Sequence, residues 1–333
     1  MATIAVVGEI VADAVLPVDG IKDGAASLTV HPGGGPANSA VALARLGTTA
    51  RFAGRISTGS LGQLAREKLE ASGVDLSASQ DTVEPQCLAI ARLSASGSAT
   101  YEFYTAGVAD FAWTDEGLAP LIDGPFTAGD APVAIHTGTL ALALQPSGLV
   151  IERLLQRARA SMTVSIDPNL RTLLIPATYY REVIDRWAAL ADIVRLSWDD
   201  LFELWPASSP EEAAARLHAL GVQLVVVSLG EDGAFASLRG DQLRVPIAPT
   251  SLVDTVGAGD SFHGGLLHHL AEHGFLGGRL ETLAVDSLRE ALEFASRVAA
   301  ITVSRPGADP PWAHELSVDE SVPQGWFGRP GKP

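Results

Sequence analysis

A glycine-rich turn followed by an acid and an apolar segment lies late in the chain. Residues 254–260 read DTVGAGD, and residues 261–267 continue as SFHGGLL. Glycine permits backbone conformations that a Cβ atom would forbid. The first turn of a helix leaves N–H groups unpaired at the positive end of its dipole. The pattern therefore predicts a tight turn that enters a helix and can bind an anion, phosphate above all.

Asp260 lies within this predicted anion site, although a carboxylate there repels a bound phosphate. A reaction resolves the conflict, because a carboxylate beside a phosphoryl group can take the proton of an attacking hydroxyl. The backbone N–H groups then hold the charge that develops. A simple helix cap is the alternative for a short glycine motif, but the longer pattern with Thr, Gly-Asp and Gly-Gly favours catalysis.

The whole stretch 254–267 resembles the C-terminal signature of the ribokinase-like (PfkB-type) carbohydrate kinases. The resemblance implies that Asp260 is the catalytic base. It also implies that three backbone N–H groups form the anion hole, those of Gly257, Ala258 and Gly259.

A second glycine turn precedes a predicted helix near the N-terminus. Residues 32–38 read PGGGPAN, and the helix that follows has Pro36 near its first turn and Gly47 as its stop. This stretch resembles the family's N-terminal signature, whose turn and asparagine hold sugar hydroxyls. A carboxylate also suits two adjacent hydroxyls, since it accepts from both. The resemblance implies four sugar-binding residues: Asp13, shortly after the first predicted strand, and Gly34, Gly35 and Asn38 in this turn. Taken alone, Asp13 fits a solvated loop acid better.

The stretch 165–171 reads SIDPNLR at the end of a predicted strand. As bare sequence it fits a polar turn equally well. It resembles the Asp-Pro-Asn-x-Arg run of fructokinase-like and other hexose or keto-sugar acid kinases. The resemblance implies that Asn169 and Arg171 approach the acceptor and the site of phosphate transfer.

Residues 195–200 read RLSWDD and follow the next predicted strand. The run resembles an Asn-x-x-Glu or Ser-x-x-Glu pattern that relatives use in their magnesium and phosphate network, with Asp200 in place of the Glu. The resemblance implies nucleotide binding by Ser197 and a magnesium contact of Asp200 through water. A helix N-terminus capped by Ser197, with acids in the first turn, is equally compatible.

Two further segments resemble the family's nucleotide site. Residues 228–233 read SLGEDG, similar to a Thr-Leu-Gly-x-x-Gly turn that meets the nucleotide phosphates, although a plain hairpin turn fits too. The resemblance implies contacts from Ser228, Gly230 and Gly233. Ser296 lies among small residues of a predicted helix, where either an adenine ring or close helix packing explains their size.

A monovalent cation site is implied at Asp254. The loop 305–308 reads RPGA and resembles one that, together with this aspartate, surrounds a monovalent cation in some relatives. The expected cofactors are therefore ATP and Mg²⁺, with K⁺ as a further candidate.

Predicted strands and helices alternate from residue 132 onward. Strands are expected at 132–137, 162–166, 193–196 and 222–227, with helices at 148–160, 178–190 and 210–220. Earlier strands are expected at 4–7 and 49–53. Such alternation predicts βαβ units in a mostly parallel sheet covered on both faces, with ligands at the carboxyl ends of the strands.

The segments 87–93 and 99–105 predict a β-hairpin around residues 94–98. The family resemblance implies a single α/β domain over residues 1–333, a ribokinase-like three-layer sandwich with a small β-sheet lid. Residues of about 12–32 and 84–108 are the candidates for this lid. Cys87 would lie in it as a buried thiol rather than a nucleophile. A homodimer formed through the lid is a further expectation.

Composition limits the classes of function. The 333 residues are 47% hydrophobic and carry a formal charge of −16, which allows a sizeable core and disfavours a nucleic-acid partner. There is a single cysteine, no basic leader and no apolar run long enough to cross a bilayer. We expect a cytoplasmic protein with no membrane partner, and a surface tail at 312–333. Four histidines on one predicted helix lack further ligands for zinc.

The leading hypothesis is an ATP-dependent sugar kinase acting on fructose or a related hexose. A nucleoside or keto-sugar acid kinase is the second hypothesis. A non-catalytic sugar or nucleotide sensor on the same fold is a third, but the intact Asp260 opposes it. A dinucleotide oxidoreductase is disfavoured because no Gly-x-Gly-x-x-Gly follows the first predicted strand.

Overall fold

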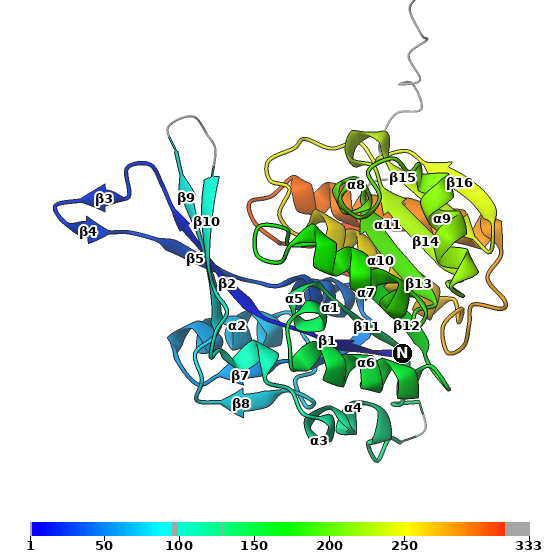
Figure 1. The fold of residues 1–333 in the computed structure, drawn as a ribbon, viewed down its shortest axis with the longest axis horizontal. Coiled ribbons are helices and arrows are strands. Elements are labelled where there is room, and N and C mark those ends of the chain that lie inside the picture. Colours follow the sequence, from blue (N-terminus) through cyan, green and yellow to red (C-terminus); the bar gives the residue numbers. More distant parts are fainter. Residues whose placement is uncertain (1, 95–98, 128, 317–333) are drawn as a thin grey trace, which may run out of the picture.

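The computed structural model describes residues 2–94, 99–127 and 129–316. Within these residues, eight strands form a central sheet in the order β16-β15-β14-β13-β12-β11-β1-β6 (Figure 1). Neighbours from β6 to β14 pair in parallel, and β15 and β16 add an antiparallel edge. The strands are β1 (Thr3–Val7), β6 (Thr49–Ala53), β11 (Pro132–Gly138), β12 (Thr163–Asp167), β13 (Ile193–Ser197), β14 (Leu224–Ser228), β15 (Ala234–Leu238) and β16 (Asp241–Val245).

Helices cover both faces of this sheet, because alternate strand residues point to opposite sides. In β1, Ile4 and Val6 pack into one core, and Ala5 and Val7 pack into the other. The first core is closed by α1 (Gly35–Leu46), α2 (Ser60–Ala71), α10 (Ala258–Glu272) and α11 (Val285–Val303). The second is closed by α6 (Ser147–Ala158), α7 (Ala177–Ala188), α8 (Trp198–Leu204) and α9 (Pro210–Ala219).

The predicted α/β class and three-layer sandwich with a mostly parallel sheet are confirmed. All five residues of β1 are buried, as a continuous apolar run in a doubly covered sheet requires. Helix α1 begins with Pro36 in its first turn and ends at Gly47, whose φ of 103° is the left-handed value that favours glycine. Strand β14 begins two residues later than the predicted segment 222–227.

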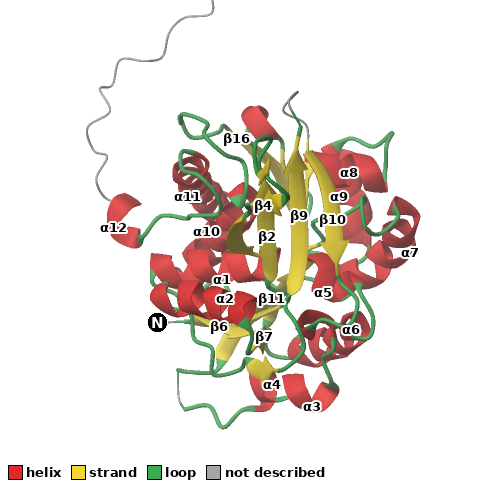
Figure 2. Cartoon of the chain, turned by 90° about the vertical axis from the view of Figure 1, so that its left-hand side faces the viewer, coloured by secondary structure: helices red, strands yellow, loops and turns green. Residues whose placement is uncertain are grey.

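A separate four-stranded sheet, here called the lid sheet, projects from the side of the main body (Figures 1 and 2). Its order is β10-β9-β2-β5, with β2 parallel to β9. The short pair β3 (Ile21–Lys22) and β4 (Ala25–Ala26) extends its far end. The predicted hairpin pairs as expected, although residues 95–98 of its turn lie outside the described residues. The strands are β2 (Val11–Leu16), β5 (Thr29–Gly33), β9 (Cys87–Leu93) and β10 (Ala99–Tyr104).

Smaller elements complete the chain. They are β7 (Arg55–Ser57), β8 (Gln80–Thr82), α3 (Asp115–Leu118), α4 (Pro120–Asp123), α5 (Thr139–Ala143) and α12 (Ala313–Leu316). Most of the predicted tail lies outside the described residues. No helix in the described part combines the length and apolar character needed to cross a membrane.

Asp110 fixes the lid sheet to the main body. This buried carboxylate accepts hydrogen bonds from the backbone N–H of Ile10 (2.8 Å) and of Cys87 (2.8 Å), and from Nε2 of Gln86 (2.6 Å). Ile10 and Cys87 lie where β2 and β9 leave the body. The Asp110 side chain therefore fixes the distance between the N-terminal ends of β2 and β9, the two central strands of the lid sheet.

Helices α1 and α10 pack very closely because α10 carries Gly264 at their contact. A Cβ atom on Gly264 would lie 2.7 Å from Cβ of Ala42 and 3.2 Å from the carbonyl oxygen of Ser39, both on α1. The hydroxyl of Ser39 donates to the carbonyl oxygen of Asp260 (3.3 Å). This approach sets the distance between the first turns of the two helices.

Substituting Gly264→Ala should lower the free energy of unfolding. Overpacking costs about 1–3 kcal/mol, against about 1 kcal/mol gained in helix propensity, so a net loss of up to about 2 kcal/mol is expected. Urea denaturation monitored by circular dichroism measures it. A variant more stable than the wild type would show that the helices can separate freely at this contact.

Candidate active site

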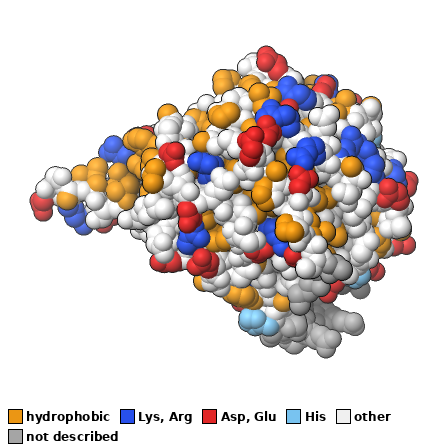
Figure 3. Space-filling view, turned by 90° about the horizontal axis from the view of Figure 1, so that it is seen from below, with side chains coloured by type: hydrophobic (Ala, Val, Ile, Leu, Met, Phe, Trp, Pro, Cys, Tyr) orange, Lys and Arg blue, Asp and Glu red, His pale blue; other side chains and the backbone are white. Residues whose placement is uncertain are grey.

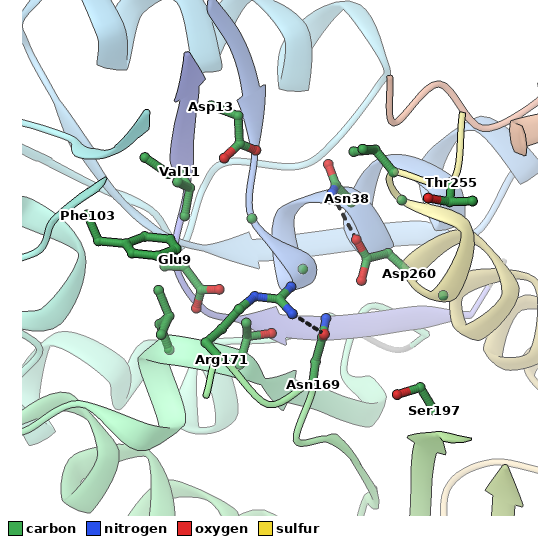
Figure 4. Close-up of a pocket in the computed structure, with 18 of the residues that line it drawn as sticks. Glu9, Val11, Asp13, Asn38, Phe103, Asn169, Arg171, Ser197, Thr255 and Asp260 are labelled. Atoms are coloured by element: carbon green, nitrogen blue, oxygen red, sulfur yellow. Dashed lines mark hydrogen bonds between the residues drawn. The ribbon is translucent and has the colours of Figure 1, made fainter. Parts of the chain in front are cut away.

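A cavity of about 360 Å³ lies between the lid sheet and the carboxyl ends of the central strands (Figure 4). It gathers residues from both ends of the chain, including ten of the predicted site residues. Those ten are Asp13, Gly34, Gly35, Asn38, Asn169, Arg171, Ser197, Gly257, Gly259 and Asp260. A neighbouring cavity of about 640 Å³ extends beneath the lid sheet to the loop 306–308 and shares Asp13 and Arg171 with the first.

The first turn of α10 forms one wall of the cavity. Gly257 precedes the helix with a φ of 75°, and a Cβ atom there would lie 2.5 Å from Cβ of Ala308, so the turn needs glycine twice over. Gly257 and Gly259 line the cavity. Ala258 does not line it, and its N–H donates to the carbonyl oxygen of Thr255 at 3.2 Å. An anion hole that uses all three predicted N–H groups therefore requires this contact to loosen.

Asp260 lies at the third position of α10 and faces the cavity. Its Oδ2 accepts a hydrogen bond of 2.8 Å from Nδ2 of Asn38 (Figure 4). Burial raises the pKa of Asp260 above its ordinary value, and the hydrogen bond from Asn38 opposes this shift. A carboxylate of raised basicity with one oxygen held and the other directed into a cavity suits a general base.

The predicted sugar side of the cavity carries a second acid. Asp13 on β2 points inward (Figure 4), and burial raises its pKa to about 6 against the opposing charges of Arg171 and Lys68. A Cβ atom on Gly35 would lie 2.6 Å from Oγ1 of Thr139 and 3.3 Å from Oδ1 of Asp260. Glycine at 35 therefore keeps open the space beside the candidate base.

The loop after β12 brings two predicted residues into the cavity together. Nη1 of Arg171 donates to Oδ1 of Asn169 (2.6 Å) (Figure 4), and Asn169 adopts a φ of 40°. Thr139, which follows the adjacent strand β11, also has a positive φ of 53°. Left-handed backbone at non-glycine residues is costly and concentrates at functional sites.

Asp200 does not line the cavity. Its Oδ2 accepts from the N–H and the hydroxyl of Ser197 (2.9 and 2.6 Å), and its Oδ1 accepts from the N–H of Leu170 (2.8 Å). The hydroxyl of Ser197 in turn accepts from the Asp200 N–H, which makes a capping box at the start of α8. This geometry favours the capping alternative, and a magnesium contact of Asp200 stays a prediction.

The remaining predicted nucleotide residues lie outside the cavity of Asp260. The hydroxyl of Ser228 accepts from Nη2 of Arg195 (2.5 Å). Gly230 and Gly233 have φ values of 60° and 83° in the turn after β14. The hydroxyl of Ser296 accepts from the N–H of Ala248 (2.8 Å), which is a structural use of this side chain. Their nucleotide roles stay predictions.

Asp254 joins the two segments expected around a monovalent cation. Its Oδ1 accepts from the N–H of Val256 (3.0 Å) and its Oδ2 from the N–H of Gly307 (2.7 Å). Across the described ranges, no group of three or more His, Cys, Asp or Glu side chains could hold a metal ion. Cys87 is free and buried in β9.

Sequence reasoning missed several residues of the cavity: Glu9, Thr139, Arg195 and Phe103. A signal existed for two of them. Glu9 is an acid two residues after the end of the first strand, and Arg195 is a charge inside an otherwise apolar strand. Oε2 of Glu9 accepts from the Ala141 N–H (2.9 Å), while its buried Oε1 has no partner.

Replacing Glu9 with Gln should stabilise the fold at high pH. Burial raises the pKa of Glu9 from 4.5 to about 7. Because the folded value is the higher one, its contribution to stability is full below pH 4.5 and is lost as pH rises through 7. Glu9→Gln should therefore gain up to about 3 kcal/mol over the wild type at pH 8, and much less at pH 4.5. Urea denaturation of the wild type, of Glu9→Gln and of a control at an exposed acid, Glu293→Gln, measures the free energy of unfolding at each pH. Equal free energies for the wild type and Glu9→Gln at every pH would contradict the prediction.

Three comparisons connect this geometry to known proteins. Residues 1–315 match the pfkB family of carbohydrate kinases. A fructokinase from Rhizobium leguminosarum bv. trifolii is 37% identical over 245 residues, 72% of this chain and 72% of the relative.

Two solved structures share the fold over nearly the whole chain. A fructokinase from Xylella fastidiosa with bound ATP has a TM-score of 0.81 at 25% identity, covering 94% of this chain and 97% of that one. A fructokinase double mutant from Vibrio cholerae O395, with fructose, ADP and potassium ion bound, has a TM-score of 0.77 at 26% identity, covering 92% and 94%. By its sequence and its fold, this chain belongs to the pfkB family of carbohydrate kinases and is a sugar kinase.

Proposed function

We propose that this protein transfers the γ-phosphoryl group of ATP to a hydroxyl of fructose or a closely related hexose. The hydrogen bond between Asn38 and Asp260 carries the proposal, since it joins the predicted sugar turn to the predicted base at one point of one cavity. The relatives named fructokinase favour fructose over a nucleoside or a keto-sugar acid. A sensor without catalysis would have no use for a buried carboxylate at the phosphate-binding turn.

In the proposed reaction the attacking sugar hydroxyl lies beside Asp260. Its oxygen forms a bond to the γ-phosphorus as the bond from that phosphorus to the β–γ bridging oxygen breaks, so ADP leaves. The hydroxyl proton passes to the carboxylate of Asp260, which later releases it to water. N–H groups of the 257–259 turn and the dipole of α10 stabilise the charge on the transferring group.

The sugar is proposed to lie against Asp13, Gly34, Gly35 and Asn38, with Asn169 and Arg171 at the acceptor side of the phosphoryl group. The ionised Asp13 can accept from two adjacent hydroxyls. The lid, residues of about 12–32 and 84–108, is proposed to close over the sugar and exclude water, because a kinase open to water hydrolyses ATP wastefully.

ATP is proposed to extend from the 257–259 turn along Ser197, Ser228, Gly230 and Gly233, toward Ser296. Asp254 fits a monovalent cation such as K⁺, since its carboxylate already joins the 254–257 turn and the loop 305–308. Mg²⁺ commonly keeps its waters and binds through substrate phosphates with few protein ligands. That habit suits this site, where Asp200 could approach it through water. When bound, Mg²⁺ neutralises phosphate charge.

A homodimer through the lid is also proposed. The arm that carries β3 and β4 projects from the body and exposes hydrophobic side chains (Figure 3), among them Val18, Ile21 and Leu28. A reducing compartment supplied with ATP, such as the cytoplasm, suits this chemistry and the single buried cysteine.

Asp260→Asn tests the proposed base. The substitution keeps the shape of the side chain and removes the proton acceptor, so kcat should fall by roughly 10²–10⁴, while ATP affinity stays near the wild-type value. Asp199→Asn, at an exposed acid in the first turn of α8, should leave kcat unchanged. Steady-state kinetics and ATP titration of each purified variant measure both. A stable Asp260→Asn protein with the kcat of the wild type would contradict the role of Asp260 as general base.

Asp13→Ala tests the proposed sugar-binding site. Loss of two charge-assisted hydrogen bonds should weaken fructose binding by on the order of 2–4 kcal/mol, as measured by calorimetry. Asp19→Ala, at an exposed acid beyond β2, is the matched control and should bind normally. An unchanged fructose affinity in Asp13→Ala would show that Asp13 does not bind the sugar.

A further inference from the structure

Arg195 is a buried arginine in the middle of the central sheet. It lies on β13, is 5% exposed, and reaches to both neighbouring strands. Its Nη1 donates to Oδ2 of Asp167 on β12 (3.0 Å), and its Nη2 donates to the hydroxyl of Ser228 on β14 (2.5 Å). Burial of a guanidinium is costly unless partners compensate the charge, so a specific use for it is expected.

The two contacts leave most of the guanidinium unused. Arginine carries five N–H donors, and Nε of Arg195 is buried with no partner. Each Nη has a second hydrogen beyond the one given to Asp167 or Ser228. Arg195 also lines the cavity that contains Asp260. A buried cation with spare donors therefore faces the proposed reaction space.

The guanidinium packs directly against the first turn of α10. A Cβ atom on Gly259 would lie 2.7 Å from Nη1 and 2.9 Å from Nη2 of Arg195. Glycine at 259 is thus what lets the cation approach this backbone. A cation at the positive end of a helix dipole is unfavourable by itself, and an anion bound between the two removes the conflict.

We propose that Arg195 is a catalytic residue that donates hydrogen bonds to the γ-phosphoryl group while it passes from ATP to the sugar. This inference rests on the proposed function and adds to it the cation that the 257–259 turn lacks. Charge spreads over the three equatorial oxygens of the transferring group, and an arginine is the side chain best suited to hold it. Asp167 and Ser228 fix the orientation of the guanidinium, so little reorganisation is needed during the reaction.

The test compares Arg195→Lys and Arg195→Ala with a matched control. Arg279 also faces a buried aspartate, Asp192, at 3.3 Å, but away from the cavity. Arg195→Ala should lower kcat by roughly 10²–10³, with fructose affinity unchanged, and low millimolar guanidinium should restore part of the rate. Arg195→Lys should keep part of the activity, because it keeps the charge. Arg279→Ala should show neither the loss nor the rescue.

Nucleotide titration gives a second readout that needs no turnover. Because the contact is to the terminal phosphoryl group, Arg195→Ala and Arg195→Lys should weaken ATP binding at least tenfold more than ADP binding. Equal losses for the two nucleotides, or a kcat within threefold of wild type, would overturn the role of Arg195.

The assays also separate this inference from the proposed function. A wild-type protein that phosphorylates no sugar contradicts the proposed function. In that case the losses of ATP and ADP affinity in the Arg195 variants still test whether Arg195 contacts the terminal phosphoryl group. An active wild type with an inactive Asp260→Asn and a fully active Arg195→Ala contradicts the inference alone.

Discussion

The hydrogen bond from Asn38 to Asp260 is the constraint on which the rest of the site depends. It joins residues 222 positions apart, from the first turns of α1 and α10. It can form only because Gly264 lets the two helices approach and Ser39 fastens the backbone of Asp260. The same bond holds one carboxylate oxygen and leaves the other for the substrate. Helix packing thus sets both the position and the basicity of the candidate base.

The second constraint is electrostatic, because several buried carboxyl groups lie in or next to the cavity. Burial raises the pKa values of Glu9, Asp13 and Asp167 to about 7, 6 and 6. The cations Arg171, in the loop after β12, and Arg195, on β13, oppose these shifts. A phosphate-transfer site built on a chain of formal charge −16 needs such local compensation. The positive end of the α10 dipole and the two guanidinium groups supply this compensation around the cavity.

The lid sheet connects the proposed sugar site to the body of the fold. Strand β2 follows β1 and carries Asp13 to the lid side of the cavity, and β10 contributes Phe103 to another part of its lining (Figure 4). Asp110 accepts hydrogen bonds from the backbone at the N-terminal ends of β2 and β9. The cavity of about 640 Å³ lies between the lid sheet and the loop 306–308.

The sequence by itself determined the local elements and the chemistry of the turns. Continuous apolar strands, helix stops such as Gly47, and the 254–260 run each follow from interactions between near neighbours, which short patterns record. The resemblance to the family signatures implied ten residues that line the cavity, and polar groups at the carboxyl ends of parallel strands are expected to meet at one edge of the sheet. Only the tertiary structure decided which partners these groups have. Asp200 uses its two oxygens on its own helix cap and on the loop after β12. Ser296 bonds to the 246–248 segment. Arg195 bonds to β12 and β14 and lies against Gly259. Such contacts depend on helix approach and sheet register between distant segments, and neither is written in the spacing of neighbouring residues.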